Sequence, residues 1–113
     1  MPFINVKTNA SVPGDKMNGI KSKLGQAITA VPGKSEGWLM VGIEPEHALW
    51  FKGSPDPAAM VEVSIFGSAS SGALSELTAR ITDILDSELG IPAARIYVKY
   101  ACTNDWGWNG SNF

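Results

Sequence analysis

Proline is the second residue of the chain, in the opening stretch MPFINVKT. This position is unusual for a strand-like segment, because proline has no amide proton to give to a sheet. A small residue after the initiator favours removal of Met1, and Pro2 would then begin the chain as a secondary amine. Proline is common in ordinary proteins, so Pro2 becomes significant only if the fold encloses it.

The other reactive side chains do not form a recognisable site. Cys102 is the only cysteine and His47 the only histidine, which excludes an internal disulfide, a dithiol redox pair and a structural zinc site. His47 follows acidic residues and is expected on the surface, with no sign of a triad or a metal site. Residues 67–72 lack the Gly-Lys-Ser/Thr ending of a phosphate-binding loop and are expected to be a connection.

Composition indicates one soluble domain covering residues 1–113, with 44% hydrophobic and 18% charged residues. The net charge of -2 gives no basic patch for nucleic acid or an anionic membrane. No apolar run approaches the roughly 20 residues that span a bilayer, and no signal sequence precedes the first strand. We therefore expect synthesis in the cytosol, no membrane insertion and no nucleic-acid partner.

The sequence predicts two similar halves, related by an offset of 57 residues and covering about 2–56 and 59–113. Each half opens with an alternating strand, at 3–6 and 60–63, and continues with apolar residues at helical spacing. The helical positions are Met17, Ile20, Leu24, Ala27, Ile28 and Val31, then Leu74, Leu77, Ile81, Ile84, Leu85 and Leu89. We expect N-caps at Asp15 and Ser71, and Gly33 and Gly90 at or just after the helix ends.

A second strand closes each half, at 38–43 and 95–100. A strand, a helix and a strand of these lengths predict a right-handed βαβ crossover. Two crossovers predict an α/β fold of the α+β type: a four-stranded mixed sheet, both helices on one face, and short edge strands around 48–51 and at the C-terminus. One parity of the second strands faces the helices, namely Leu39, Val41, Ile43, Ile96, Val98 and Tyr100.

The opposite face of this sheet mixes apolar and polar side chains. Its members are Trp38, Met40, Tyr97, Asn5, Glu62 and Lys99. This surface is too apolar for open solvent and too polar for a closed core. We therefore expect a homo-oligomer whose subunits cover one another's sheets.

Several segments together resemble the macrophage migration inhibitory factor (MIF) family of the tautomerase superfamily. They are residues 1–4 (MPFI), 33–34 (GK), 51–57 (FKGSPDP), 95–97 (RIY) and 107–113 (GWNGSNF). The resemblance spans the whole chain. It implies a homotrimer of doubled βαβ subunits, with active sites between neighbouring subunits and no cofactor.

The resemblance further implies that Pro2, once Met1 is removed, is a catalytic base. A free amine is mostly protonated at neutral pH, but burial and a nearby cation lower its pKa, and Lys34 is the matching cation. The base would remove a proton next to a carbonyl group and return it at the conjugate position. Lys34 would also hold the carboxylate of an α-keto acid; without the resemblance, a solvated lysine would be the better interpretation.

Further residues match the substrate pocket of the family. The backbone amide of Phe66 would bind substrate, and Ile65 would line the pocket. The matching aromatic walls are Trp38, Tyr97, Trp108 and Phe113, although such residues are more often simply core. Lys99 replaces an asparagine of animal members, so it either favours a second acidic group or points into solvent. Phe66 replaces a smaller aliphatic residue, which would narrow the pocket.

Two functions fit these features. The first is a keto-enol tautomerase of the phenylpyruvate or dopachrome type, acting on a small aromatic α-keto acid. The alternative is a cytokine-like or host-modulating signalling protein, in which the pocket is vestigial or contacts a cell-surface receptor. The expected location is the cytoplasm, and secretion by a non-classical route stays open.

Overall fold

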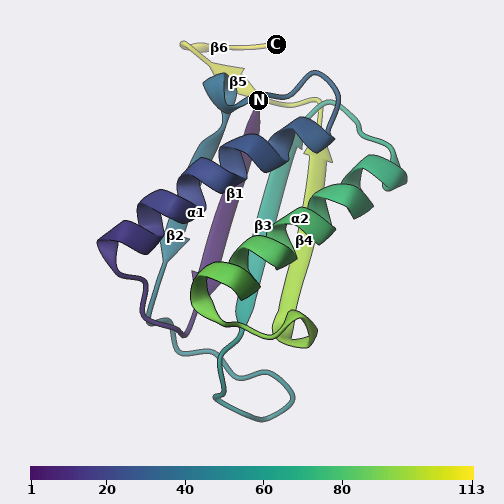
Figure 1. Cartoon of the computed structure of the whole chain (residues 1–113). Coiled ribbons are helices and arrows are strands. Elements are labelled where there is room, and N and C mark those ends of the chain that lie inside the picture. The colour runs from purple at the N-terminus through teal and green to yellow at the C-terminus, as the bar shows by residue number, and fades with distance from the viewer.

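Two helices lie side by side over one face of a four-stranded sheet in the computed structural model, which describes residues 1–113 (Figure 1). The helices are α1 (Gly14–Ala27) and α2 (Ser71–Leu89). The strands are β1 (Pro2–Thr8), β2 (Met40–Glu44), β3 (Ala59–Phe66) and β4 (Ile96–Thr103). Short 3-10 turns are η1 (Ile28–Ala30), η2 (Glu36–Trp38) and η3 (Ala93–Arg95), and the chain ends in β5 (Gly107–Trp108) and β6 (Ser111–Asn112).

The sheet is mixed, with strand order β2-β1-β3-β4. β1 runs parallel to β2 and antiparallel to β3, and β3 runs parallel to β4. Each parallel pair is joined through a helix, as a βαβ crossover requires. The predicted fold class is confirmed: an α/β chain with both helices on one face of a four-stranded mixed sheet.

The core lies between the helices and the sheet. Ile4 and Val6 of β1 and Val61 of β3 are fully buried, because alternate residues of these strands face the helices. Leu24 of α1 and Leu77 of α2 meet them from above. The predicted parity of the outer strands is also confirmed, since Leu39, Val41, Ile43, Ile96, Val98 and Tyr100 pack against this core.

The helix boundaries correct several expectations. Ser70, not Ser71, caps α2, because its Oγ accepts a hydrogen bond from the Ala73 amide at 3.1 Å. Pro13 stands at the N-cap of α1, and Asp15 lies within the first turn. A carboxylate there stabilises the helix, because it lies near the positive end of the helix dipole. Gly90 ends α2 in the left-handed conformation, φ 67°, as predicted.

The strand expected at 38–43 begins later, at Met40, because Trp38 belongs to η2. Residues 48–50 form no strand within the chain, and only Phe51 makes a bridge, to Ser54. The C-terminal edge strands are present as the β5–β6 hairpin.

Two tight turns have the same backbone conformation at an offset of 57 residues. Lys52 and Gly53 have φ values of 51° and 75°, and Asn109 and Gly110 have 52° and 85°. Positive φ at both central residues is the type I′ turn that matches hairpin twist. The second turn joins β5 to β6, and thus places the C-terminal aromatic residues.

No helix of this structure combines the length and the apolar character needed to cross a bilayer.

Candidate active site

Pro2 is buried at the first position of β1, where it pairs with Ile65 of β3. The Phe66 amide donates a hydrogen bond to the Met1 carbonyl at 3.0 Å. The Lys34 ammonium donates to the Phe66 carbonyl at 2.9 Å. Pro2, Lys34 and Phe66, which the sequence singled out, therefore meet at one end of the sheet.

The amine that begins the chain lies in an unusual electrostatic setting. Burial lowers the pKa of the Met1 amine below its ordinary value, and the positive charge and contact of Lys34 lower it further. Both effects disfavour a second cation at this place. An amine here is neutral, and able to accept a proton, at a lower pH than a free one.

An open pocket of about 380 Å³ lies beside Pro2. Its lining comes from β1, from η2 with the start of β2, and from the C-terminal segment: Met1, Pro2, Phe3, Gly37, Trp38, Leu39, Met40, Trp106, Gly107 and Trp108. The Trp38 and Trp108 rings meet edge to face, with centroids 5.2 Å apart and planes at 83°. The lining suits a flat, apolar ligand.

The C-terminal residues extend this aromatic wall. The Phe113 ring lies 5.0 Å from that of Phe66 and stacks 6.3 Å from that of Trp108. The Phe113 amide donates to the Trp106 carbonyl at 3.1 Å. Trp106 was missed in the sequence, although Trp106 and Trp108 stand two residues apart, the spacing that puts both on one face of a strand.

Ile65 does not contribute its side chain to the pocket. That side chain is fully buried, because its position in β3 faces the helices rather than the open face. Ile65 is not among the residues that line the pocket in one chain, and its part in binding substrate stays a prediction.

Tyr97 and Lys99 lie elsewhere in the chain. Tyr97 pairs with Met60, five residues before the Ile65 that pairs with Pro2, which puts the two about 16 Å apart along the strand direction. Both residues belong to the open face, where the Lys99 ammonium is 3.8 Å from Glu62. Within one chain, the predicted pocket residues therefore form two separate groups.

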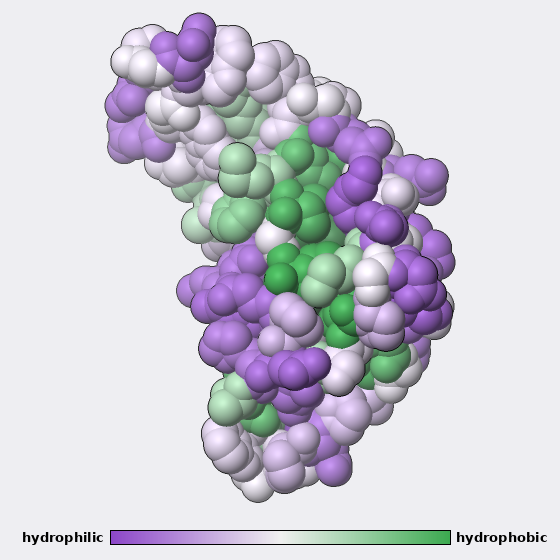
Figure 2. Space-filling view, turned by 90° about the vertical axis from the view of Figure 1, so that its left-hand side faces the viewer, coloured by the Kyte–Doolittle hydropathy of each residue, from purple (hydrophilic) through white to green (hydrophobic).

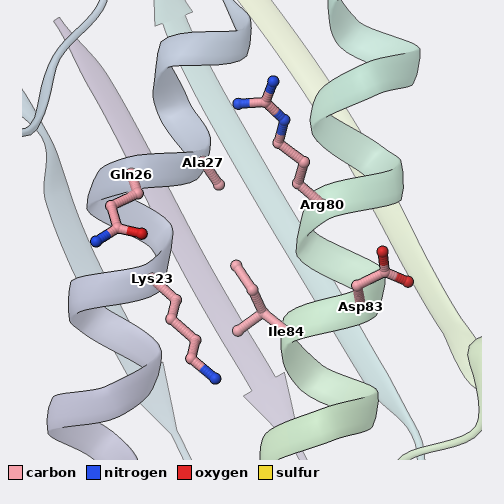
Figure 3. Close-up of a pocket in the computed structure, with 6 residues that line it drawn as sticks. All are labelled: Lys23, Gln26, Ala27, Arg80, Asp83 and Ile84. Atoms are coloured by element: carbon pink, nitrogen blue, oxygen red, sulfur yellow. The ribbon is translucent and has the colours of Figure 1, made fainter.

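A second pocket lies between the two helices, on the far side of the sheet from the open face (Figure 3). Its lining is largely polar, with Lys23 and Gln26 from α1 and Arg80 and Asp83 from α2. None of the predicted site residues borders it. The candidate active site is therefore the pocket at Pro2.

Comparison with known proteins bears on this site. The family described as Macrophage migration inhibitory factor (MIF) matches residues 1–113. The chain belongs to the MIF family. This confirms the resemblance found in the sequence.

Relatives and a solved structure agree with this assignment. The macrophage migration inhibitory factor of Xenopus laevis is 31% identical over 118 residues, which cover 100% of this chain and 99% of that protein. The D-dopachrome decarboxylase of Gallus gallus is 29% identical over 108 residues, 94% of this chain and 90% of that protein. The crystal structure of Leishmania major MIF2 has a TM-score of 0.93 at 34% identity and covers 100% of this chain and 97% of its own.

Proposed function

We propose that this protein is a keto-enol tautomerase whose general base is the secondary amine of Pro2, freed by removal of Met1. The observation that carries the proposal is the enclosure of the chain start beside Lys34, where an amine has a lowered pKa. Membership of the MIF family and similarity to a D-dopachrome decarboxylase support an isomerase of this kind.

The proposed reaction moves one proton and no net electrons. The neutral amine removes a proton from the carbon next to a carbonyl group, and the electron pair of that bond moves toward the carbonyl oxygen. The protonated amine then returns its proton to that oxygen, and the reverse sequence gives the keto form. A well-placed base of this kind contributes about 10²- to 10⁴-fold.

Lys34 and Phe66 supply the proposed contacts to the substrate. The Lys34 ammonium is placed to pair with a carboxylate and to fix the acidic C–H against the amine. The Phe66 amide, which donates to the Met1 carbonyl in this structure, is available to a substrate oxygen once Met1 is removed. In this proposal, the Lys34 ammonium and the Phe66 amide are the two donors beside the base.

The aromatic lining of the pocket indicates the substrate class. Trp38 and Trp108 line the pocket with aromatic rings, and Phe113 stacks on Trp108. Lys34, which bonds to the neighbouring Phe66 carbonyl, would be the carboxylate partner. We infer a small aromatic α-keto acid such as phenylpyruvate, with dopachrome-type compounds as close analogues. No step of this chemistry calls for a cofactor.

Tyr97 and Lys99 enter the proposal through a homotrimer. Met40 and Tyr97 are 68% and 60% exposed on the open face. Large exposed apolar side chains of this kind are typical of a protein interface. Along the edge of the sheet that β2 forms, hydrophobic side chains make a band between hydrophilic areas (Figure 2). A neighbouring subunit on these surfaces would bring its Tyr97 and Lys99 toward Pro2.

A second candidate function is cytokine-like or host-modulating signalling through a receptor, favoured by the names of the relatives. We propose that the protein is located in the cytoplasm. Signalling through a receptor would require its export. Receptor binding that survives the loss of Pro2 chemistry would distinguish signalling from catalysis.

The test is ketonisation of phenylpyruvate by tag-free protein whose loss of Met1 is verified by mass. We expect Pro2→Gly to lose about 100-fold or more of kcat/KM, with circular dichroism showing the fold retained. A matched variant with one alanine added before Pro2 keeps the ring but turns its amine into an amide, and should be equally inactive. A correctly trimmed, trimeric wild type without activity would refute the enzyme proposal for this substrate class.

A further inference from the structure

Arg95 binds the loop between β2 and β3 through four backbone carbonyls. Its Nε donates to Pro57 at 2.9 Å and its Nη1 to Phe51 at 3.1 Å. Its Nη2 donates to Ser54 at 3.0 Å and Asp56 at 2.9 Å. Only guanidinium has enough donors in a fixed plane for this set, because lysine offers a single nitrogen.

The same guanidinium reaches an aromatic pair. Its central carbon lies 5.2 Å from the centre of the Phe51 ring, within the range of a cation–π contact. Phe51 meets Tyr97 edge to face, with centroids 4.9 Å apart and planes at 75°. A continuous set of contacts therefore joins Arg95 to Tyr97 through Phe51.

The loop has a second, independent anchor. Asn9 Nδ2 donates to the carbonyls of Pro55 and Asp56 at 3.0 and 2.9 Å, and Asn9 Oδ1 accepts from the Ala58 amide at 2.9 Å. Loss of the Arg95 contacts thus leaves the loop attached, and changes mainly the support of the Phe51 ring.

We propose that Arg95 is a positioning residue for substrate binding, because it holds Phe51 against Tyr97 and so fixes the orientation of the Tyr97 ring. This inference rests on the proposed function, which puts Tyr97 in the wall of a neighbouring subunit's pocket. Arg95 itself does not touch the substrate. Its effect should be on substrate affinity rather than on proton transfer.

The two tyrosines of the chain make this testable by 19F NMR with fluorotyrosine, since only Tyr97 and Tyr100 give signals. Tyr100 is held apart by hydrogen bonds to Thr78 and Leu74. We expect Arg95→Lys, which keeps the charge and loses the planar fork, to shift or broaden the Tyr97 resonance alone. Phe51→Leu should reproduce the change, and Arg80→Lys on the surface of α2 should not.

Enzyme kinetics supply the second test, because a positioning role should change KM and not kcat. Arg95→Lys should raise KM for phenylpyruvate about threefold to tenfold, with kcat little changed and the trimer intact. An unaltered Tyr97 resonance, or an unaltered KM, overturns the proposal, as does an Arg95→Lys protein that no longer assembles. If wild type lacks activity, the proposed function fails by itself, and the NMR result still decides whether Arg95 orients the ring.

Discussion

At the scale of single residues, the amine at the chain start and the Lys34 ammonium are two cationic groups whose simultaneous charging costs free energy. The amine at the chain start lies beside the Lys34 ammonium, and its partial burial is the larger cause of its lowered pKa. Lys34 is held in place by the Phe66 carbonyl. The arrangement lowers the pH above which the amine is neutral, and a general base must be neutral to accept a proton.

Lys34→Gln should move the pH dependence of activity. The rate rises with pH as the amine loses its proton, and removal of the neighbouring positive charge raises the pKa of that amine. The acid limb of kcat/KM should therefore shift to higher pH, and KM should rise because the carboxylate loses its partner. Lys21→Gln, on the exposed side of α1, is the matched control; an unmoved limb in Lys34→Gln would argue against an electrostatic role.

At the scale of elements, the helices are tied together by charge on their exposed side. Glu88 of α2 lies 2.6 Å from the Lys23 ammonium and 3.6 Å from that of Lys16, both on α1. The hydrogen bond from Lys23 is the main cause that lowers the pKa of the Glu88 carboxyl. The two lysine side chains remain largely open to solvent, so these contacts stabilise the fold only modestly.

Glu88→Gln should lower the melting temperature slightly at about pH 7 and by a smaller amount at about pH 3. The pKa of Glu88 is depressed in the folded state, so its stabilisation is present above the ordinary glutamate pKa and is lost as the pH falls through the depressed value. Thermal unfolding at both pH values measures this. Glu76→Gln, which breaks an ion pair within α2, controls for general surface charge, and an equal loss at both pH values would contradict the assignment.

The C-terminal hairpin is a second element with a direct link to the pocket. Gly110 has a φ of 85°, and an alanine in this conformation costs about 1–2 kcal/mol. Gly110→Ala should loosen the turn that carries Trp108 and precedes Phe113, and should raise KM more than it lowers kcat. Gly72→Ala, at an open position in α2, should change neither value. Substrate kinetics with thermal unfolding decides, and an unchanged KM in Gly110→Ala would exclude the hairpin from binding.

Regular burial explains what could be predicted at this scale and what could not. Apolar periodicity gave the strands and helices, because one face of each element is removed from water. The choice of Ser70 over Ser71 as cap depended on one side-chain hydrogen bond. Pro2 and Lys34 could be placed from the family resemblance, whereas Trp106 and the Arg95 contacts depend on irregular backbone whose carbonyls no sequence pattern specifies.

At the scale of the whole molecule, the distance between Pro2 and Tyr97 is the strongest argument for assembly. One chain places them at different ends of the sheet, so a pocket that uses both needs two copies. We propose one domain of two repeats, about 2–56 and 59–113, supported by the matched turns at Gly53 and Gly110. Three such chains in a ring would complete three equivalent sites.

Mixing two variants, each impaired at a different residue of the proposed pocket, tests the shared site. Pro2→Gly and Tyr97→Ala subunits, unfolded together and refolded at equal amounts, should regain activity, because about a quarter of the sites then combine an intact Pro2 with an intact Tyr97. Each variant refolded alone is the control. No recovery in mixed trimers, verified by sedimentation, would mean that each chain carries its own complete site.

The role of Pro2 as the base is tested most directly by an NMR titration of its nitrogen, in 15N-proline-labelled protein that has lost Met1. We predict that the pKa of this amine lies below that of a free secondary amine and equals the pKa on the acid limb of kcat/KM for phenylpyruvate. A Pro2 amine that keeps its ordinary pKa, or that titrates apart from the activity, would contradict its role as the catalytic base.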